Sequence, residues 1–332
     1  MINSKELSDS EIVPLNRSVF DGDPALADAV RKYGEHALSP NTLRARRADW
    51  QAFSIWCRDR QQTSLPAAPS TVAGYLADCS EKGKAVATIT RYAQTITAAH
   101  QAAGLPSPTL HAGVRGVLAG IRRTRGVKQN QKAAFTADIA MRSVPHGDDL
   151  ISLRNRAILL VGLATAMRRS ELSALIVTDI RYIDEGAVIE IRRSKTDQEG
   201  EGQFVLLPKL DGEYCPVASL RAWLAASGIA EGSVFRGTLN HKLRATALSG
   251  RQIALVLKKA VAAAGLDPAV FSGHSMRAGF VTDQRNAGTE WTAIMEQTRH
   301  KSLEMAKRYA RYSPDAMRNT KIADAMRKLF TR

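Results

Sequence analysis

The chain has 332 residues, 44% hydrophobic and 24% charged, a balance that is ordinary for a globular protein and does not favour a disordered one. Its 47 Lys and Arg against 32 Asp and Glu give a formal net charge of +15, which favours a polyanionic partner such as nucleic acid. A basic protein with a well-solvated surface is the alternative. The three scattered cysteines are too few for a disulfide framework or a zinc site.

The N-terminal sequence MINSKELSDSE has no apolar core, so we expect no signal peptide. The longest apolar run, residues 157–167, is shorter than the ~18 residues that suggest a membrane span. We therefore expect an internal protein, cytoplasmic and nucleoid-associated, that makes no membrane contact. Residues 1–22 are predicted to be a flexible leader, and the remaining length suits roughly two domains.

Residues 23–125 predict a bundle of short helices. Ser39 and Pro40 form an N-cap followed by a helix-starting proline. Beyond them, apolar residues fall on one face at helical spacing: Leu43, Trp50, Phe53 and Cys57. Further helices are predicted over residues 69–80, 85–103 and 109–125, the last two closed by Gly104 and Gly126. Residues 126–134 are polar and aperiodic and are predicted to be a linker.

The stretch between Glu81 and Asp138 contains no acidic residue. Its basic residues are Lys82, Lys84, Arg91, Arg115, Arg122, Arg123, Arg125, Lys128 and Lys132. A solvated protein surface normally mixes both signs of charge. We therefore interpret the stretch as a face for nucleic acid, with a purely solvated face as the alternative.

Residues 135–332 predict a second domain that mixes helices with a few strands. Thr136 is expected to be an N-cap, and helices are predicted over residues 153–164 and after Ser170-Glu171. Short β-prone runs over residues 177–180, 188–191 and 204–207 predict a small antiparallel sheet. Lys195 lies where the second strand turns into the third. From Pro216 onward the signals are helical, with Ser249 and Gly265 bounding a helix over residues 250–264.

Seven polar residues of this second region occur in a suggestive order: Arg168, Glu171, Lys195, His274, Arg277, His300 and Tyr309. Singly, each has a structural explanation such as a cap, a surface charge or an interfacial tyrosine. Together they read Arg-x-x-Glu, Lys on a hairpin, His-x-x-Arg, His, and Tyr nine residues later. This pattern resembles the tyrosine recombinase (phage integrase) family. Ala166-Met167 stands where that family usually has Gly-Leu or a similar pair.

The resemblance extends into the N-terminal half, where LRARRADWQAFSIWC and KAVATITRYAQTITAAHQAAGLPSP are similar to helices of simple two-domain members. It implies a mainly α fold with a small antiparallel β-sheet: an all-α N-terminal core-binding bundle (residues 23–125), the linker, and an α+β catalytic domain (residues 135–332). Together the two would form a C-shaped clamp on DNA.

The resemblance also implies partners and cofactors. The expected partner is double-stranded DNA with an inverted-repeat recombination site, bound by a protein that is monomeric in free solution and a homo-tetramer on two sites. No metal or other cofactor is expected. A C-terminal helix over residues 315–330, with Ile322, Met326, Leu329 and Phe330 on one face, would pass between subunits. Packing of this helix on its own domain is the alternative.

Phosphodiester chemistry suggests roles for the seven residues. A guanidinium is always protonated and forks onto two oxygens. Arg168 and Arg277 are therefore predicted to clamp the scissile phosphate, with His300 as a third donor. Glu171, one helical turn after Arg168, is predicted to orient the site.

The nucleophile is predicted to be Tyr309, because its spacing from His300 fits the family better than that of its rival, Tyr312. A free phenol has a pKa near 10, so positive neighbours and a proton acceptor must assist it. His274 is the candidate acceptor, and Lys195 is the candidate general acid for the leaving 5′-oxygen.

The residues that would recognise the DNA sequence are inferred from the resemblance alone. The resemblance places Arg44 and Arg91 on helices that face the major groove of DNA and matches Arg251 to a base-contacting arginine, and Arg47 is a further candidate for DNA binding. Arg to guanine is the commonest specific pairing. Each could equally contact a phosphate or be a solvated charge. The predicted activity is site-specific recombination through a 3′-phosphotyrosine and a Holliday junction. A type IB topoisomerase and a non-catalytic DNA-binding regulator are the alternatives.

Overall fold

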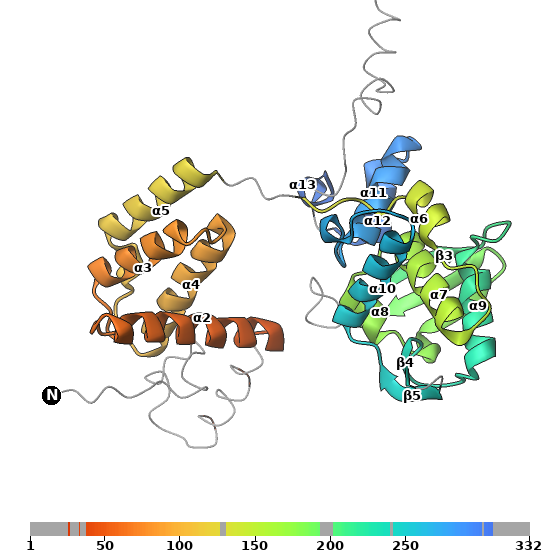
Figure 1. Ribbon diagram of the computed structural model, residues 1–332, viewed down its shortest axis with the longest axis horizontal. Coiled ribbons are helices and arrows are strands. Elements are labelled where there is room, and N and C mark those ends of the chain that lie inside the picture. Colours follow the sequence, from red (N-terminus) through yellow and green to blue (C-terminus); the bar gives the residue numbers. More distant parts are fainter. Residues whose placement is uncertain are drawn as a thin grey trace, which may run out of the picture. The chain divides into compact units, whose positions relative to one another are not determined.

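The computed structural model describes residues 38–126, 131–192, 202–239, 242–300 and 302–307, together with Leu26 and Tyr33. The chain divides into two compact units, Met1–Asn130 and Gln131–Arg332 (Figure 1). Several predicted features lie outside the described residues: the leader over residues 1–22, residues 127–130 of the linker, Lys195, Tyr309, and the helix over residues 315–330.

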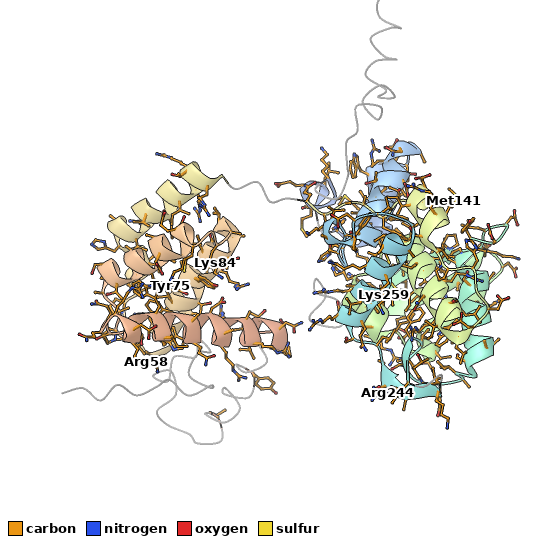
Figure 2. The ribbon with its side chains drawn as sticks, viewed as in Figure 1. Arg58, Tyr75, Lys84, Met141, Arg244 and Lys259 are labelled. Carbon is orange, nitrogen blue, oxygen red and sulfur yellow. The ribbon has the colours of Figure 1, made fainter. Side chains whose placement is uncertain are left out.

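The described part of the N-terminal unit is helical, as predicted. It comprises α2 (Pro40–Asp59), α3 (Pro69–Glu81), α4 (Val86–Ala102), the 3-10 turn η2 (Pro108–Leu110) and α5 (Ala112–Arg125). Ser39 caps α2 as expected, because its hydroxyl accepts the Thr42 N–H at 3.3 Å. Aromatic rings fill the space between the helices. Tyr75, inside the unit in Figure 2, has its ring centroid 5.0 Å from that of Phe53.

The helix predicted over residues 109–125 is interrupted. Pro108 starts a separate 3-10 turn, and α5 begins only at Ala112. His111, in an extended conformation, makes the break because its Nδ1 accepts the Gly113 N–H at 3.1 Å. A side chain that satisfies a free backbone donor of the first turn fixes where a helix starts.

The C-terminal unit is built around α7 (Leu150–Thr165), whose residues are buried along most of its length. In Figure 1, α7 lies between α9 and α10, and it packs against both as well as against α11 and β3. The other helices are α6 (Ala137–Ser143), α8 (Arg169–Ala174), α9 (Pro216–Ser227), α10 (Gly250–Ala263), α11 (Ser275–Asn286), α12 (Trp291–Thr298) and α13 (Leu303–Lys307), with 3-10 turns η3 (Val177–Asp179) and η4 (Pro268–Val270).

Two antiparallel sheets complete this unit. One has the order β1-β2-β3, from β1 (Ile180–Ile183), β2 (Gly186–Ile191) and β3 (Gln203–Pro208); the other pairs β4 (Arg236–Leu239) with β5 (Lys242–Ala247). The register of the first sheet places Ile189 opposite both Ile180 and Val205. The fold is thus mainly α with a small antiparallel sheet, which confirms the predicted class.

Two predictions about strands were wrong. The first strand begins at Ile180 rather than at Val177, because Asp179 Oδ2 accepts the Ile176 N–H at 3.1 Å and closes a 3-10 turn. The hairpin of β4 and β5 was missed altogether, since only helices were expected after Pro216. β5 is almost entirely exposed and therefore lacks the alternation of apolar and polar residues that identifies a half-buried strand.

Gly279, on α11, marks a close backbone approach that fixes this helix. A Cβ at this position would lie 1.8 Å from the Phe135 carbonyl oxygen, a contact that no real Cβ makes. Phe135 cannot easily retreat, because it is fully buried and its N–H donates to the Ser275 carbonyl at 2.8 Å. We expect Gly279→Ala to lower the free energy of unfolding by about 3 kcal/mol, as measured by urea denaturation.

Gly120 in α5 provides the control for this prediction. A Cβ there would meet nothing within 4 Å, so Gly120→Ala should stabilise the protein by about 0.5–1 kcal/mol through helix propensity. If Gly279→Ala unfolded at the wild-type urea concentration, the close contact with Phe135 would be refuted.

Candidate active site

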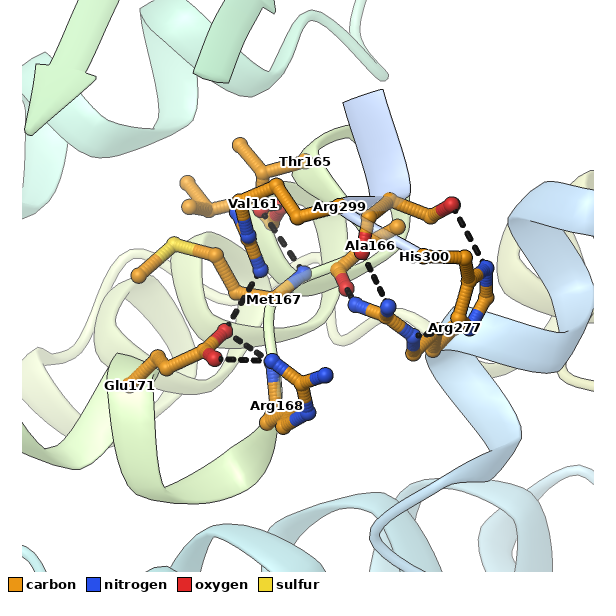
Figure 3. Close-up of polar contacts among 10 residues, drawn as sticks. Val161, Thr165, Ala166, Met167, Arg168, Glu171, Arg277, Arg299 and His300 are labelled. Atoms are coloured by element: carbon orange, nitrogen blue, oxygen red, sulfur yellow. Dashed lines mark hydrogen bonds and ion pairs between the residues drawn. The ribbon is translucent and has the colours of Figure 1, made fainter. Parts of the chain in front are cut away.

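The turn between α7 and α8 presents the first predicted catalytic residues. Ala166 ends α7 in a left-handed conformation (φ 50), a region that favours glycine. Met167 follows with 1% of its surface exposed, which anchors the turn in the core. Arg168 is then the N-cap residue of α8. The turn thereby directs the Ala166 carbonyl and the Arg168 side chain toward one region (Figure 3).

Glu171 holds Arg168 at two points. Its Oε2 accepts the Arg168 backbone N–H at 2.7 Å, and its Oε1 accepts Arg168 Nη1 at 2.7 Å. The glutamate is buried, whereas the Arg168 side chain keeps 11% of its surface exposed. Glu171 therefore fixes both the backbone and the side chain of an arginine that solvent can still reach.

Arg277, on the first turns of α11, connects three segments of the chain. It is 1% exposed, and its Nη1 donates to the Ala166 carbonyl at 2.8 Å. Nη2 donates to the Thr298 carbonyl at the end of α12, and Nε donates to His300 Nε2 at 3.3 Å. Figure 3 shows the guanidinium between these groups. Arg277 thus ties the end of α7 to the end of α12.

His300 is buried and its hydrogen bonds define its tautomer. The Thr298 hydroxyl donates to the Ile294 carbonyl at 2.6 Å, so its oxygen must accept the bond from His300 Nδ1–H at 2.8 Å. Nε2 then carries the lone pair that accepts from Arg277. Burial, followed by the charges of Arg277, Arg168 and Arg299, lowers the pKa of His300 to about 3. In this arrangement the imidazole is neutral, and donation from Nε2 to a phosphate would require an added proton.

The low pKa of His300 makes folding stability depend on pH. Because the pKa is about 3 in the folded chain against 6.5 ordinarily, the unfolded state binds more protons between those values. The contribution of His300 to the free energy of unfolding is therefore fully present above pH 6.5. It decreases as the pH drops toward 3, by up to about 1.4 kcal/mol per pH unit. Urea denaturation at several pH values should show that His300→Gln flattens this dependence. Equal pH dependence in the two proteins would contradict a neutral, buried His300.

The other predicted site residues that the structure describes have no contact reported above with Arg168, Glu171, Arg277 or His300. His274 is exposed at the N-terminus of α11, one turn before Arg277. Arg44 and Arg47 are exposed on α2, and Arg251 is exposed on the first turn of α10. Arg91, on α4, donates from Nε and Nη2 to the buried carboxylate of Asp49 at 2.7 and 2.8 Å. Arg91 is thus held in an ion pair within the N-terminal unit.

The structure gathers Arg168, Glu171, Arg277 and His300 into one cluster, and it adds Arg299 and Thr298, which sequence reasoning missed. Arg299 Nη2 donates to Glu171 Oε2 at 2.6 Å (Figure 3). Arg299 could have been recognised from its position in the sequence: an arginine lies immediately before His300, at a helix end where Gly or Asn is usual.

Within the described ranges, no group of three His, Cys, Asp or Glu side chains is placed to hold a metal ion. No helix among the same residues is long and apolar enough to cross a membrane.

The same architecture occurs in solved DNA complexes. The Tn1549 transposon integrase bound to a circular intermediate DNA matches with a TM-score of 0.61 and 17% identity, covering 97% of this chain and 100% of that chain. XerH, in a post-cleavage complex with palindromic difH substrate, matches with a TM-score of 0.60 and 14% identity, covering 93% of this chain and 91% of that chain. The fold is therefore that of the tyrosine recombinases.

Sequence similarity identifies the family. The pattern described as "Phage integrase family" matches residues 139–315. An "Integrase/recombinase xerD homolog" from Selenomonas ruminantium is 37% identical over 282 residues, which is 83% of this chain and 82% of that protein. The chain belongs to the phage integrase family and is a tyrosine recombinase, an enzyme that breaks and rejoins DNA strands.

Proposed function

We propose that this enzyme is a site-specific, Cre-like recombinase that exchanges strands between paired DNA sites through a 3′-phosphotyrosine and a Holliday junction. The observation that supports this most is the cluster of Arg168, Glu171, Arg277 and His300, which the fold assembles from α8, α11 and the end of α12. Two permanent cations in one place suit a phosphodiester on which negative charge grows during transfer.

In the proposed reaction the Tyr309 oxygen attacks the scissile phosphorus and its proton passes to an acceptor, for which His274 is the candidate. The bond from phosphorus to the 5′-oxygen breaks, and Lys195 gives that oxygen a proton. Arg168 and Arg277 stabilise the charge on the non-bridging oxygens. The phosphotyrosine conserves the energy of the broken bond, so the 5′-hydroxyl of a second strand can attack it without ATP or metal.

Double-stranded DNA with an inverted repeat is the proposed partner. In the N-terminal unit, α5 exposes Arg115, Arg122, Arg123 and Arg125, and Lys82 and Lys84 are exposed nearby in the sequence. Exposed Lys and Arg side chains bind a phosphate backbone by displacing its counterions into solution. Residues 23–125 would form the core-binding domain and residues 135–332 the catalytic domain, with four copies assembled on two sites.

Covalent trapping tests this proposal against its two alternatives. The substrates are inverted repeats from the DNA that flanks the gene, nicked beside the cleavage position so that the released strand end diffuses away. We expect a protein–DNA adduct that survives denaturation, and recombinant products only when two sites are present. A topoisomerase would instead relax supercoiled DNA that carries no paired site. A non-catalytic regulator would bind the repeat without any adduct.

A further inference from the structure

Arg299 combines two unfavourable features. It ends α12 in a left-handed conformation (φ 55, ψ 45), which is strained for any residue with a Cβ. Its guanidinium is also buried: 4% of the side chain is exposed, and burial lowers its pKa, against the raising effect of Glu171. Strain and buried charge beside a predicted active site indicate that the residue has a functional role.

Among the described residues, the Arg299 side chain has its hydrogen bond with one group, the Glu171 carboxylate. Nη2 donates to Glu171 Oε2 at 2.6 Å, while Nε and Nη1 are buried without a partner among the described residues. Glu171 does not need this third donor to be satisfied. Arg168 already supplies a hydrogen bond to each carboxylate oxygen, from its backbone N–H and from Nη1. The contribution of Arg299 is therefore mainly its charge.

Charge matters here because one carboxylate is shared by two guanidiniums. Arg168 and Glu171 alone would form a neutral pair, whereas the group of Arg168, Glu171 and Arg299 carries a net charge of +1. Sharing also affects geometry, since Glu171 accepts only Nη1 from the Arg168 side chain. Among the described residues, Arg168 Nε and Nη2 donate to no protein group, and the side chain remains 11% exposed.

We propose that Arg299 is a positioning residue for DNA cleavage. It binds Glu171 so that the carboxylate orients Arg168 without neutralising its charge. The positive charge of Arg168 and its Nε and Nη2 donors are then left for the scissile phosphate. This inference rests on the proposed function, in which Arg168 binds that phosphate. It adds a third arginine, which does not itself touch DNA, to the two predicted to clamp the phosphate.

Four variants test the role of the charge. Arg299→Gly relieves the backbone strain, Arg299→Met keeps the length of the side chain, and Arg299→Lys keeps its charge. The fourth adds Glu171→Gln to Arg299→Gly and so removes the carboxylate that Arg299 balances. Each protein is mixed at saturating concentration with the nicked substrate, and the single-turnover rate of adduct formation is measured beside DNA affinity and urea stability.

We expect Arg299→Gly and Arg299→Met to cleave about 10- to 100-fold more slowly, by analogy with the loss caused by removing a residue that orients a metal ligand, with little change in DNA affinity. Arg299→Lys should retain most of the rate. The double variant should cleave faster than Arg299→Gly alone, because a neutral amide no longer cancels the charge of Arg168.

Two results would overturn the inference. Arg299→Met cleaving at the wild-type rate would show that the charge is not used, and this variant decides the matter if Arg299→Gly fails to fold. A double variant no faster than Arg299→Gly would show that the loss is structural. Absence of an adduct with the wild-type protein would instead refute the proposed function, so the two failures are distinguishable.

Discussion

Arg277→Ala should slow DNA cleavage by at least about 10²–10³-fold, the loss found when one preorganised donor to a transition-state charge is removed. The expected loss exceeds that of an ordinary phosphate contact because Arg277 also positions other groups. Its guanidinium donates to the Ala166 carbonyl, the Thr298 carbonyl and His300. Without it, the turn that carries Arg168 loses the link that Arg277 makes between the Ala166 carbonyl and the end of α12, while the contact of Arg299 with Glu171 remains. DNA affinity should change far less, since a transition-state interaction contributes little to ground-state binding.

Arg285→Ala, on the same helix, separates catalysis from folding. Arg285 donates to the Thr289 carbonyl at 2.7 Å and stacks over Trp291 at 4.6 Å, so its removal disturbs the structure of α11 without touching the cluster. We expect this variant to lose stability but to cleave at nearly the wild-type single-turnover rate under conditions where it is folded. If both variants lost cleavage in proportion to their stability, Arg277 would be a structural arginine only.

The helices that could be predicted from sequence carry their own boundary signals. Ser249 caps α10 as expected, with its hydroxyl accepting the Gln252 N–H, and Gly265 follows the last turn with φ 76. Such signals act over a few residues and can therefore be read from a few residues. Where a boundary depends on less usual chemistry, as with the imidazole of His111 before α5 or the carboxylate of Asp179 before β1, the prediction was displaced or wrong.

In the candidate site, too, contacts between residues close in the sequence could be predicted and contacts between distant residues could not. The contact from Glu171 to Arg168 spans three positions and follows from helical geometry, so an orienting role could be predicted from spacing. The contact from Arg299 to Glu171 joins residues 128 positions apart. No local pattern specifies it, because only the packing of α12 against the rest of the C-terminal unit brings them together. The tautomer of His300 likewise depends on Thr298 and Arg277 acting jointly.

Tyr309→Phe should abolish the covalent adduct while leaving DNA binding nearly unchanged. The substitution removes one oxygen and keeps the ring, so the loss falls on the step that forms the phosphorus–oxygen bond. The arginines of the described cluster are not nucleophiles, and His300 Nε2 is engaged by Arg277 in a buried position. Adduct formation on the nicked substrate, beside a binding titration, measures both properties.

Tyr312→Phe is the matched control, since it removes the same atom three residues away. It should form the adduct at a rate close to that of the wild-type protein. Reversed phenotypes would make Tyr312 the nucleophile. Adducts formed by both single variants would show that either phenol can reach the phosphate, in which case the double substitution should be the one that abolishes cleavage. Selective loss in Tyr309→Phe would place the nucleophile nine residues after His300, as the spacing of the sequence predicts.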